Sequence, residues 1–103
     1  MSTLNPNQRK EYQARFNRVI DYIDSHLDEQ LSLEKLSEIA NFSPFHFHRI
    51  FSAMMGETLS KFILRIRLER AASRLVSNPK LSITEVAFEF GFSGSASFAR
   101  SFK

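Results

Sequence analysis

The sequence predicts an all-α protein in which two helix-turn-helix subdomains are joined by a long central helix. Three observations support this prediction. Only three Gly and three Pro interrupt 103 residues that are 43% hydrophobic and include eleven Phe, a composition that suits packed helices better than turn-rich sheets. An uninterrupted stretch of helical periodicity runs through the middle of the chain. A short sequence unit occurs once before that stretch and once after it.

Residues 12–27 are predicted to form an amphipathic first helix. Its apolar residues recur at helical spacing: Phe16, Val19, Ile20, Ile23 and Leu27. The polar residues 1–11 carry no such periodicity, so we expect a flexible N-terminal segment there. A single domain is expected to follow over residues 12–103.

A short unit is repeated on either side of the middle of the chain. Leu31-Ser32-Leu33 returns as Leu81-Ser82-Ile83, and Phe47-His48-Arg49-Ile50-Phe51 returns as Phe98-Ala99-Arg100-Ser101-Phe102, with one residue inserted between them in the second copy. Such a repeat indicates two copies of one supersecondary unit. We place the first unit at about residues 31–56 and the second at about residues 81–103.

Each copy has the parts of a helix-turn-helix. Ser32 and Ser82 are predicted N-caps of a short helix, because a serine hydroxyl accepts a hydrogen bond from an otherwise unsatisfied amide of the first turn. Asn41 and Gly91 are residue types that tolerate the positive φ of a tight turn after that helix. A second serine then starts another helix, at Ser43-Pro44 in the first copy and at Ser93 in the second.

Residues 59–76 are predicted to form the longest helix, which ends before Asn78-Pro79 because a residue preceding proline avoids the α region. Its apolar residues fall on two nearly opposite faces: Leu59, Phe62 and Ile66 on one, and Leu64, Leu68, Ala71, Ala72 and Leu75 on the other. Arg67, Arg70 and Arg74 form a strip between these faces. A helix buried on two sides lies between two bodies, so we expect a strut that joins the two units.

Charge and composition limit the partners of the chain. Fourteen Lys and Arg against eleven Asp and Glu give a net charge of +3, and the acidic residues concentrate between Glu11 and Glu38. This balance permits a polyanionic partner without requiring one. The lack of cysteine excludes a disulfide framework and a thiolate metal site. Without an apolar run long enough to span a membrane, or a signal peptide, we expect a cytoplasmic protein with no membrane contact.

The helix after Ser43 is predicted to turn one face to the core and the other to a ligand. The predicted core face is Phe47, Ile50, Phe51 and Met54, and the opposite stripe is Phe45, His48, Arg49 and Ser52. Arginine can donate two hydrogen bonds to guanine, histidine can donate or accept, and an exposed ring can pack on a thymine methyl. The stripe therefore predicts a major-groove face. The alternative interpretations are a core position for Phe45 and a surface ion pair for Arg49.

The equivalent helix of the second copy is predicted to be less specific for base sequence than the first. Its stripe opposite Phe98 consists of Ala96, Ala99, Arg100 and Lys103, preceded by Ser93 and Ser95. Arg100 corresponds to Arg49, whereas the two alanines offer methyl contacts and a close approach but no long hydrogen-bonding group. A purely structural role for Arg100 stays open.

Four segments form a recognisable set: Leu31-Ser32-Leu33-x2-Leu36, Ser43-Pro44-Phe45-His46-Phe47-His48-Arg49-Ile50-Phe51, Arg67-Leu68-x2-Ala71-x3-Leu75 and Val86-Ala87-x3-Gly91-Phe92-Ser93-x4-Phe98-x-Arg100-x-Phe102-Lys103. Over about residues 16–103 this set resembles the AraC/XylS family of bacterial transcription regulators. The resemblance implies a seven-helix domain that binds double-stranded DNA, with two recognition helices in adjacent major grooves. By motif position it makes Phe45, His48 and Arg49 base-facing, and it puts Ser95, Ala96, Ala99 and Arg100 on the second recognition helix.

The resemblance also implies RNA polymerase as a partner in the cell and no cofactor. Two departures from the family pattern stand out. Ser37 occupies a position where the family commonly has alanine, and the chain stops at Lys103, where the pattern continues into a closing helix. We therefore expect a second unit truncated at its C-terminus. We also expect a companion effector-binding domain that lies C-terminal to this fragment.

Three other functions compete with DNA binding. The strongest alternative is a helical protein-interaction module that uses the exposed Phe45 face as its anchor. RNA binding lacks the aromatic platform on which single strands stack. Catalysis is disfavoured because no phosphate loop or activated nucleophile is visible, and because His46 and His48 point to different helix faces rather than forming a metal pair.

Overall fold

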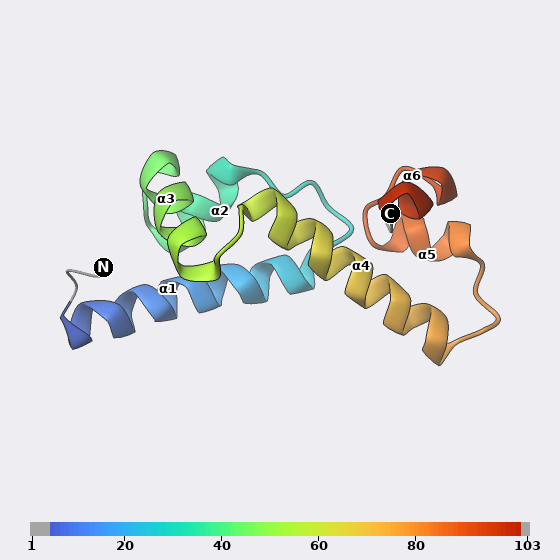
Figure 1. The fold of residues 1–103 in the computed structure, drawn as a ribbon, viewed down its shortest axis with the longest axis horizontal. Coiled ribbons are helices and arrows are strands. Elements are labelled where there is room, and N and C mark those ends of the chain that lie inside the picture. The colour runs from blue at the N-terminus through green and yellow to red at the C-terminus, as the bar shows by residue number, and fades with distance from the viewer. Residues whose placement is uncertain (1–4, 102–103) are drawn as a thin grey trace.

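A computed structural model describes residues 5–101, which form helices and no strand (Figure 1). The helices are α1 (Pro6–Ser25), α2 (Leu33–Ala40), α3 (Pro44–Met55), α4 (Leu59–Ser77), α5 (Ile83–Glu89) and α6 (Ser95–Ser101). The all-α prediction is confirmed, and so is the long central helix, α4. The molecule is elongated, with extents of 50 × 23 × 23 Å. None of the helices within residues 5–101 is long and apolar enough to cross a membrane.

Helix α1 begins earlier than the sequence periodicity predicts. The expected flexible segment 1–11 is wrong from Asn5 onward, because Asn5 caps a helix that starts at Pro6. The Asn5 side chain accepts a hydrogen bond from the Gln8 amide at 2.8 Å, and the Gln8 side chain accepts one from the Asn5 amide at 3.0 Å. This reciprocal capping box satisfies two amides that would otherwise lack partners. Residues 1–4 lie outside the described part of the chain.

Helices α1, α2 and α3 surround an aromatic core. Phe16 of α1 stacks on Phe42 and Phe47, with ring centroids 5.7 and 5.3 Å apart, and lies 6.0 Å from Phe51. Phe16, Phe47 and Phe51 are all at most 1% exposed. Since buried aromatic rings contribute both area and favourable ring geometry, this cluster helps to hold α3 against α1.

The turn between α2 and α3 has the predicted chemistry. Ser32 caps α2 by accepting a hydrogen bond from the Lys35 amide, and Asn41 ends that helix in the left-handed region, at φ 60°. Ser37, which departs from the family pattern, is buried, and its hydroxyl donates to the Glu34 carbonyl at 2.9 Å. A satisfied hydroxyl at this position leaves the packing of α2 undisturbed.

The core face predicted for α3 is correct except at its last residue. Phe47 and Phe51 are fully buried and Ile50 is partly buried against the same core, whereas Met54 is 41% exposed. Met55, one position further, packs against the core instead. Helix α3 ends at Met55, with Gly56 as its C-cap, so in the last turn Met55 takes the core position that the sequence period assigns to Met54.

The second unit is built from α5 and α6 on the far half of α4. Ser82 and Glu85 form the predicted capping box of α5. Among the described residues, its core holds Ala71 of α4, Val86, Ala87 and Phe98, and the Phe92 and Phe98 rings lie 5.1 Å apart. Gly91 makes the turn at φ 86°, in the left-handed region that glycine adopts without strain.

Helix α4 packs on both bodies, as its two apolar faces predict. Leu59, Phe62 and Ile63 belong to the first core, and Ala71 belongs to the second. Leu64, expected on the second face, is instead 40% exposed, because it lies before the point where the second unit meets the helix. The strut prediction is therefore correct, with a boundary between the two bodies near the middle of α4.

Candidate nucleic-acid interface

Helix α3 turns a polar and aromatic stripe to the solvent. Phe45 is 71% exposed, and His48 and Arg49 are also exposed. The Arg49 guanidinium carbon lies 5.7 Å from the centre of the Phe45 ring, as the i, i+4 spacing on a helix permits. The structure rules out the core position for Phe45. Within residues 5–101 no acidic side chain pairs with Arg49, so its donors point into open solvent and are available to a ligand.

The structure gives Ser52, the last residue of the predicted stripe, and Ser43, the predicted start of the helix, different surroundings. Ser43 is exposed, and its hydroxyl accepts a hydrogen bond from the His46 amide at 3.2 Å as the N-cap of α3. The Ser52 hydroxyl is buried and has no hydrogen-bond partner among the described residues. Serine has the shortest polar side chain and stays close to the helix backbone, below its longer neighbours. The Ser52 hydroxyl is therefore not accessible to a ligand, whereas Ser43 caps the start of α3.

We expect Ser43→Ala to lower the free energy of unfolding by about 1 kcal/mol, because the His46 amide loses its acceptor. Thermal unfolding measures this change. Ser43→Asn provides the matched control, since asparagine also caps helices and should keep the melting temperature near that of the wild type. Equal stability of the alanine and asparagine variants would show that the cap does not hold α3.

Helix α6 presents a flatter surface. Ser95, Ala96, Ala99 and Arg100 are exposed, and Phe98 on the opposite side is 3% exposed. Arg100 is exposed like Arg49, and within residues 5–101 no carboxylate pairs with it. The predicted site residue Lys103 lies outside the described residues. The exposed stripe of α6 thus offers one long donor between small side chains.

Ser93 does not begin α6, contrary to the prediction. The Gly94 carbonyl accepts from the Phe98 amide at 3.2 Å, which is the bond that the Ser43 carbonyl makes with the Phe47 amide in the first unit. Gly94 therefore occupies the N-cap position. The residue inserted in the second copy moves Ser93 one step back, where its hydroxyl donates to the Ser97 hydroxyl at 3.1 Å. Ser93 remains exposed beside the helix start.

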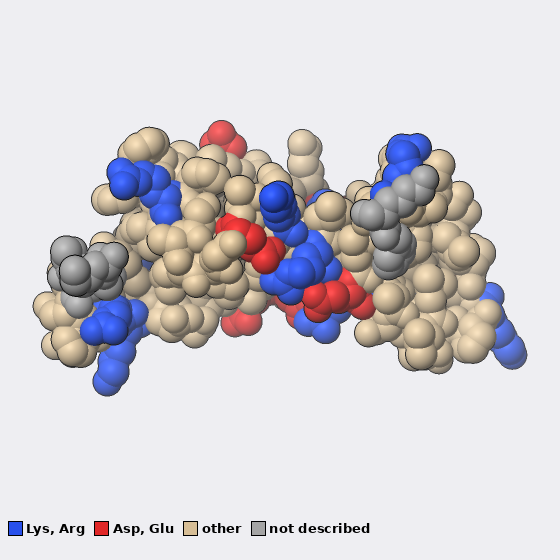
Figure 2. Space-filling view, viewed as in Figure 1, with Lys and Arg blue, Asp and Glu red and all other residues tan. Residues whose placement is uncertain are grey.

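Charged side chains in the middle of the molecule are largely neutralised by one another. Arg65 donates to Glu57 and Glu69, and Arg70 and Arg74 pair with Asp24 and Glu89. The hydrogen bonds that Arg65 donates to Glu69 and Glu57 raise the pKa of Arg65. Figure 2 shows this mixture of acids and bases at the centre, while basic side chains project at the upper edge over α3 and again over α6. Exposed positive charge thus lies near both helices with accessible stripes, and Figure 2 also shows it at the two lower ends of the molecule.

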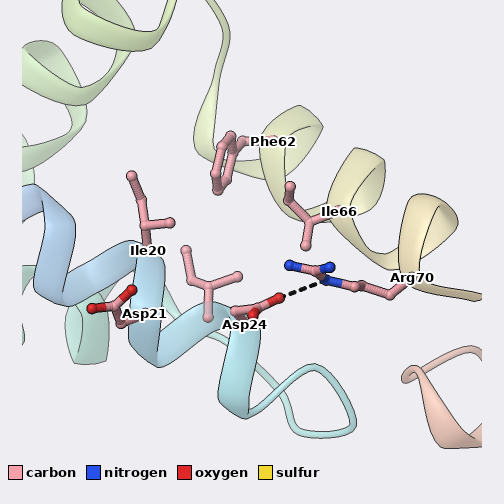
Figure 3. Close-up of a pocket in the computed structure, with 7 residues that line it drawn as sticks. Ile20, Asp21, Asp24, Phe62, Ile66 and Arg70 are labelled. Carbon is pink, nitrogen blue, oxygen red and sulfur yellow. Dashed lines mark hydrogen bonds and ion pairs between the residues drawn. The ribbon is translucent and has the colours of Figure 1, made fainter.

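The pocket between α1 and α4 is separate from these stripes. It has a volume of about 200 Å³, and its walls are Ile20, Ile23, Phe62 and Ile66, with Asp21, Asp24 and Arg70 at the rim. Figure 3 shows the Arg70–Asp24 ion pair closing one side of it. The walls of this pocket are apolar, and its cationic side chain, Arg70, is already paired with Asp24. The pocket therefore does not suit a polyanion, and the candidate interface consists of the exposed faces of α3 and α6.

Comparison with known proteins agrees with this arrangement. A family model described as a helix-turn-helix domain matches residues 36–103. An uncharacterized HTH-type transcriptional regulator of Staphylococcus aureus is 38% identical over 101 residues, or 98% of this chain and 13% of that protein. The uncharacterized HTH-type transcriptional regulator YbfP of Bacillus subtilis is 36% identical over 92 residues, or 89% of this chain and 31% of that protein. The chain thus spans only a minor part of the length of these curated relatives.

Two solved structures share the fold. An AraC-type transcriptional regulator from Chromobacterium violaceum superposes with a TM-score of 0.78 at 24% identity, over 87% of this chain and 80% of that one. The DNA-binding domain of AdpA, solved in complex with a target DNA, gives a TM-score of 0.73 at 28% identity, over 84% of this chain and 77% of that one. Both structures therefore cover most of the present fold.

Two capped helix pairs on one central helix define a double helix-turn-helix domain. With the matching family model and relatives, this architecture identifies the chain as a member of the AraC-type family of helix-turn-helix transcriptional regulators. The resemblance found in the sequence is confirmed.

Proposed function

We propose that this chain binds double-stranded DNA in a sequence-specific manner as the DNA-reading part of a transcription regulator. The observation that carries the proposal is the exposed stripe of α3, in which Phe45, His48 and Arg49 project from a helix whose other face is locked into the core. A rigid helix with outward donors is the element that helix-turn-helix proteins place in the major groove. The solved complex of the AdpA domain with its target DNA supports this assignment.

The length of the molecule supports contact by both units. In Figure 1, α3 lies above α1 and α6 lies above the far half of α4, toward opposite ends of the long axis. That axis measures 50 Å, whereas successive major-groove openings on one side of B-DNA are about 34 Å apart. One chain can therefore bring α3 and α6 to adjacent major grooves, a task that usually requires two helix-turn-helix subunits. We also propose that the whole protein acts in the cytoplasm, contacts RNA polymerase and carries a separate effector-binding domain.

Selection from a random pool of duplex DNA tests the proposal. We expect the chain to enrich sequences that contain two short motifs about one helical turn apart, because each recognition helix reads a few base pairs. Enrichment of a single motif would remove α6 from sequence reading. Recovery of unenriched sequence after repeated rounds would contradict sequence-specific binding altogether.

A titration with salt separates DNA binding from the alternative of a protein-interaction module centred on exposed Phe45. Phosphate contacts release counterions, so the logarithm of the DNA affinity should fall linearly with the logarithm of the salt concentration. We expect a slope of about −0.9 for each phosphate contacted. A slope near zero would show that the charged groups of α3 and α6 do not meet a DNA backbone.

A further inference from the structure

The second helix-turn-helix unit also contacts the loop that joins α1 to the first unit. Gly91, in the turn between α5 and α6, lies against Leu27, in the loop that follows α1. A Cβ atom placed on Gly91 would be only 2.6 Å from the Leu27 carbonyl oxygen. The backbone of the second unit therefore rests on the backbone of the loop that leads from α1 into the first unit, at a distance that only glycine permits. Gly91 also has a φ of 86°, which independently favours glycine there.

The Arg67 side chain of α4 binds the loop that Gly91 contacts. Its Nε donates to the Leu27 carbonyl at 3.1 Å, and its Nη2 donates to the Glu29 carbonyl at 2.7 Å. Burial lowers the pKa of Arg67, although the group remains cationic at neutral pH. The planar guanidinium fixes two loop carbonyls at once. The same guanidinium is close to Gly91, since a Cβ atom at that glycine would lie 3.1 Å from Arg67 Cζ.

Neighbouring side chains extend this contact in both directions. Phe90, next to Gly91, packs against the apolar cores of both units. Arg70 binds Asp24 of α1 at 2.7 Å (Figure 3), and Arg74 binds Glu89 of α5 at 3.0 Å. Arg70, near the middle of α4, thus binds α1, and Arg74, near the end of α4, binds α5 of the second unit. Leu27, Arg67, Phe90 and Gly91 form the closest part of this contact, which we call the junction.

We propose that the junction fixes the distance and rotation between α3 and α6, and thereby determines how many base pairs must separate the two half-sites. This inference rests on the proposed DNA-binding function. Arg67 and Gly91 are positioning residues, because they select DNA through spacing and not through contact with a base. Insertion of one base pair moves a half-site by about 3.4 Å and rotates it by about 35°. A pair of units locked by the junction cannot follow that movement, whereas a loosened pair can.

The test measures affinity for duplexes that carry the two selected half-sites at the selected spacing, or with one base pair inserted or removed. For the wild type we expect either change to lower the affinity about tenfold or more, comparable to a wrong base pair. Gly91→Ala and Arg67→Lys should bind the selected spacing more weakly, and the loss on changing the spacing should shrink to about threefold or less. Gly91→Ala pushes the backbone at residue 91 away from the backbone at Leu27. Arg67→Lys keeps the positive charge but loses the planar group that donates to two carbonyls at once.

Two control variants match these changes away from the junction. Gly56→Ala places a side chain at a φ of 73°, yet its Cβ atom would meet nothing within 4 Å. It therefore reproduces the backbone strain of Gly91→Ala without affecting the junction. Arg65→Lys makes the same chemical change as Arg67→Lys on a neighbouring residue of α4 that pairs with Glu57 and Glu69. Both controls should keep the steep dependence on spacing.

A second measurement uses no DNA. Spin labels at the exposed residues Ala53 of α3 and Ala96 of α6 report the distance between the two helices. We expect a narrow distance distribution in the wild type and a broad one in both junction variants. Arg67→Lys introduces no backbone strain, so both measurements can be made on this variant if Gly91→Ala fails to fold. Junction variants with the spacing dependence and the distance distribution of the wild type would overturn this inference and leave DNA binding intact. A wild-type chain that selects no duplex would overturn both proposals.

Discussion

Phe16→Ala is expected to lower the free energy of unfolding by about 3 to 5 kcal/mol, the usual range for deleting a buried phenyl ring. Phe16 is 1% exposed and contacts the rings of Phe42, Phe47 and Phe51. A small domain has only about 5 to 15 kcal/mol of stability, so the loss is a large part of the total. We expect the melting temperature to fall by more than about 12 °C, and DNA binding to be lost at temperatures where the wild type is folded.

The same substitution at an exposed position provides the control. Phe88 is 58% exposed, so Phe88→Ala removes an identical ring that is mostly in water already. We expect a change of less than about 1 kcal/mol in the free energy of unfolding. Similar destabilisation by the two variants would mean that the cluster around Phe16 does not organise the first unit.

Arg49→Ala is expected to weaken binding to the selected DNA by about 1 to 3 kcal/mol and to relax the preference at one base pair, because a two-bond contact with guanine has that energy. Arg100→Ala should weaken binding with less change in base preference, because the stripe of α6 offers small side chains and its contacts mainly fix position. The measurement is a scan of all single base substitutions in both half-sites at constant salt.

Arg18→Ala controls for net charge, since Arg18 is exposed on α1 and belongs to neither stripe. It should leave the base preferences of both half-sites unchanged. Base preferences that persist in Arg49→Ala would remove Arg49 from sequence reading. Equal penalties for wrong bases in the two half-sites would contradict the asymmetry between α3 and α6 and would point to DNA shape as the source of specificity.

Helices whose ends carry a chemical signal can be predicted closely from the sequence. Ser32 and Ser43-Pro44 begin α2 and α3, and Asn78-Pro79 marks the end of α4. The start of α1 escapes prediction although Asn5 and Gln8 have the types of a capping box, because the first two turns contain no apolar residue to reveal a period. Met54 is predicted to be buried for the opposite reason. Its period continues, but in the last turn of α3 Met55 packs against the core and Met54 is 41% exposed.

The candidate site is predictable only where it depends on one helix. The periodicity of α3 correctly separates Phe45, His48 and Arg49 from the core, and the roles of these residues in base reading stay a prediction. The junction is not predictable, because the bond from Arg67 to Leu27 joins residues 40 positions apart. Local patterns show that Arg67 lies between two apolar faces but contain no information on which carbonyls it meets. Gly91 is recognisable as a turn residue, and its close approach to Leu27 depends on tertiary packing.

The division of α3 into a buried and an exposed face has a consequence for how such proteins diversify. Phe47 and Phe51 hold the helix in place, whereas Phe45, His48 and Arg49 contribute little to the core. Substitutions at exposed positions usually change stability by no more than about 0.5 kcal/mol. A lineage can therefore exchange these three residues, and with them its target genes, without passing through unstable intermediates. The same separation makes α3 a practical starting point for engineering a regulator with a new operator.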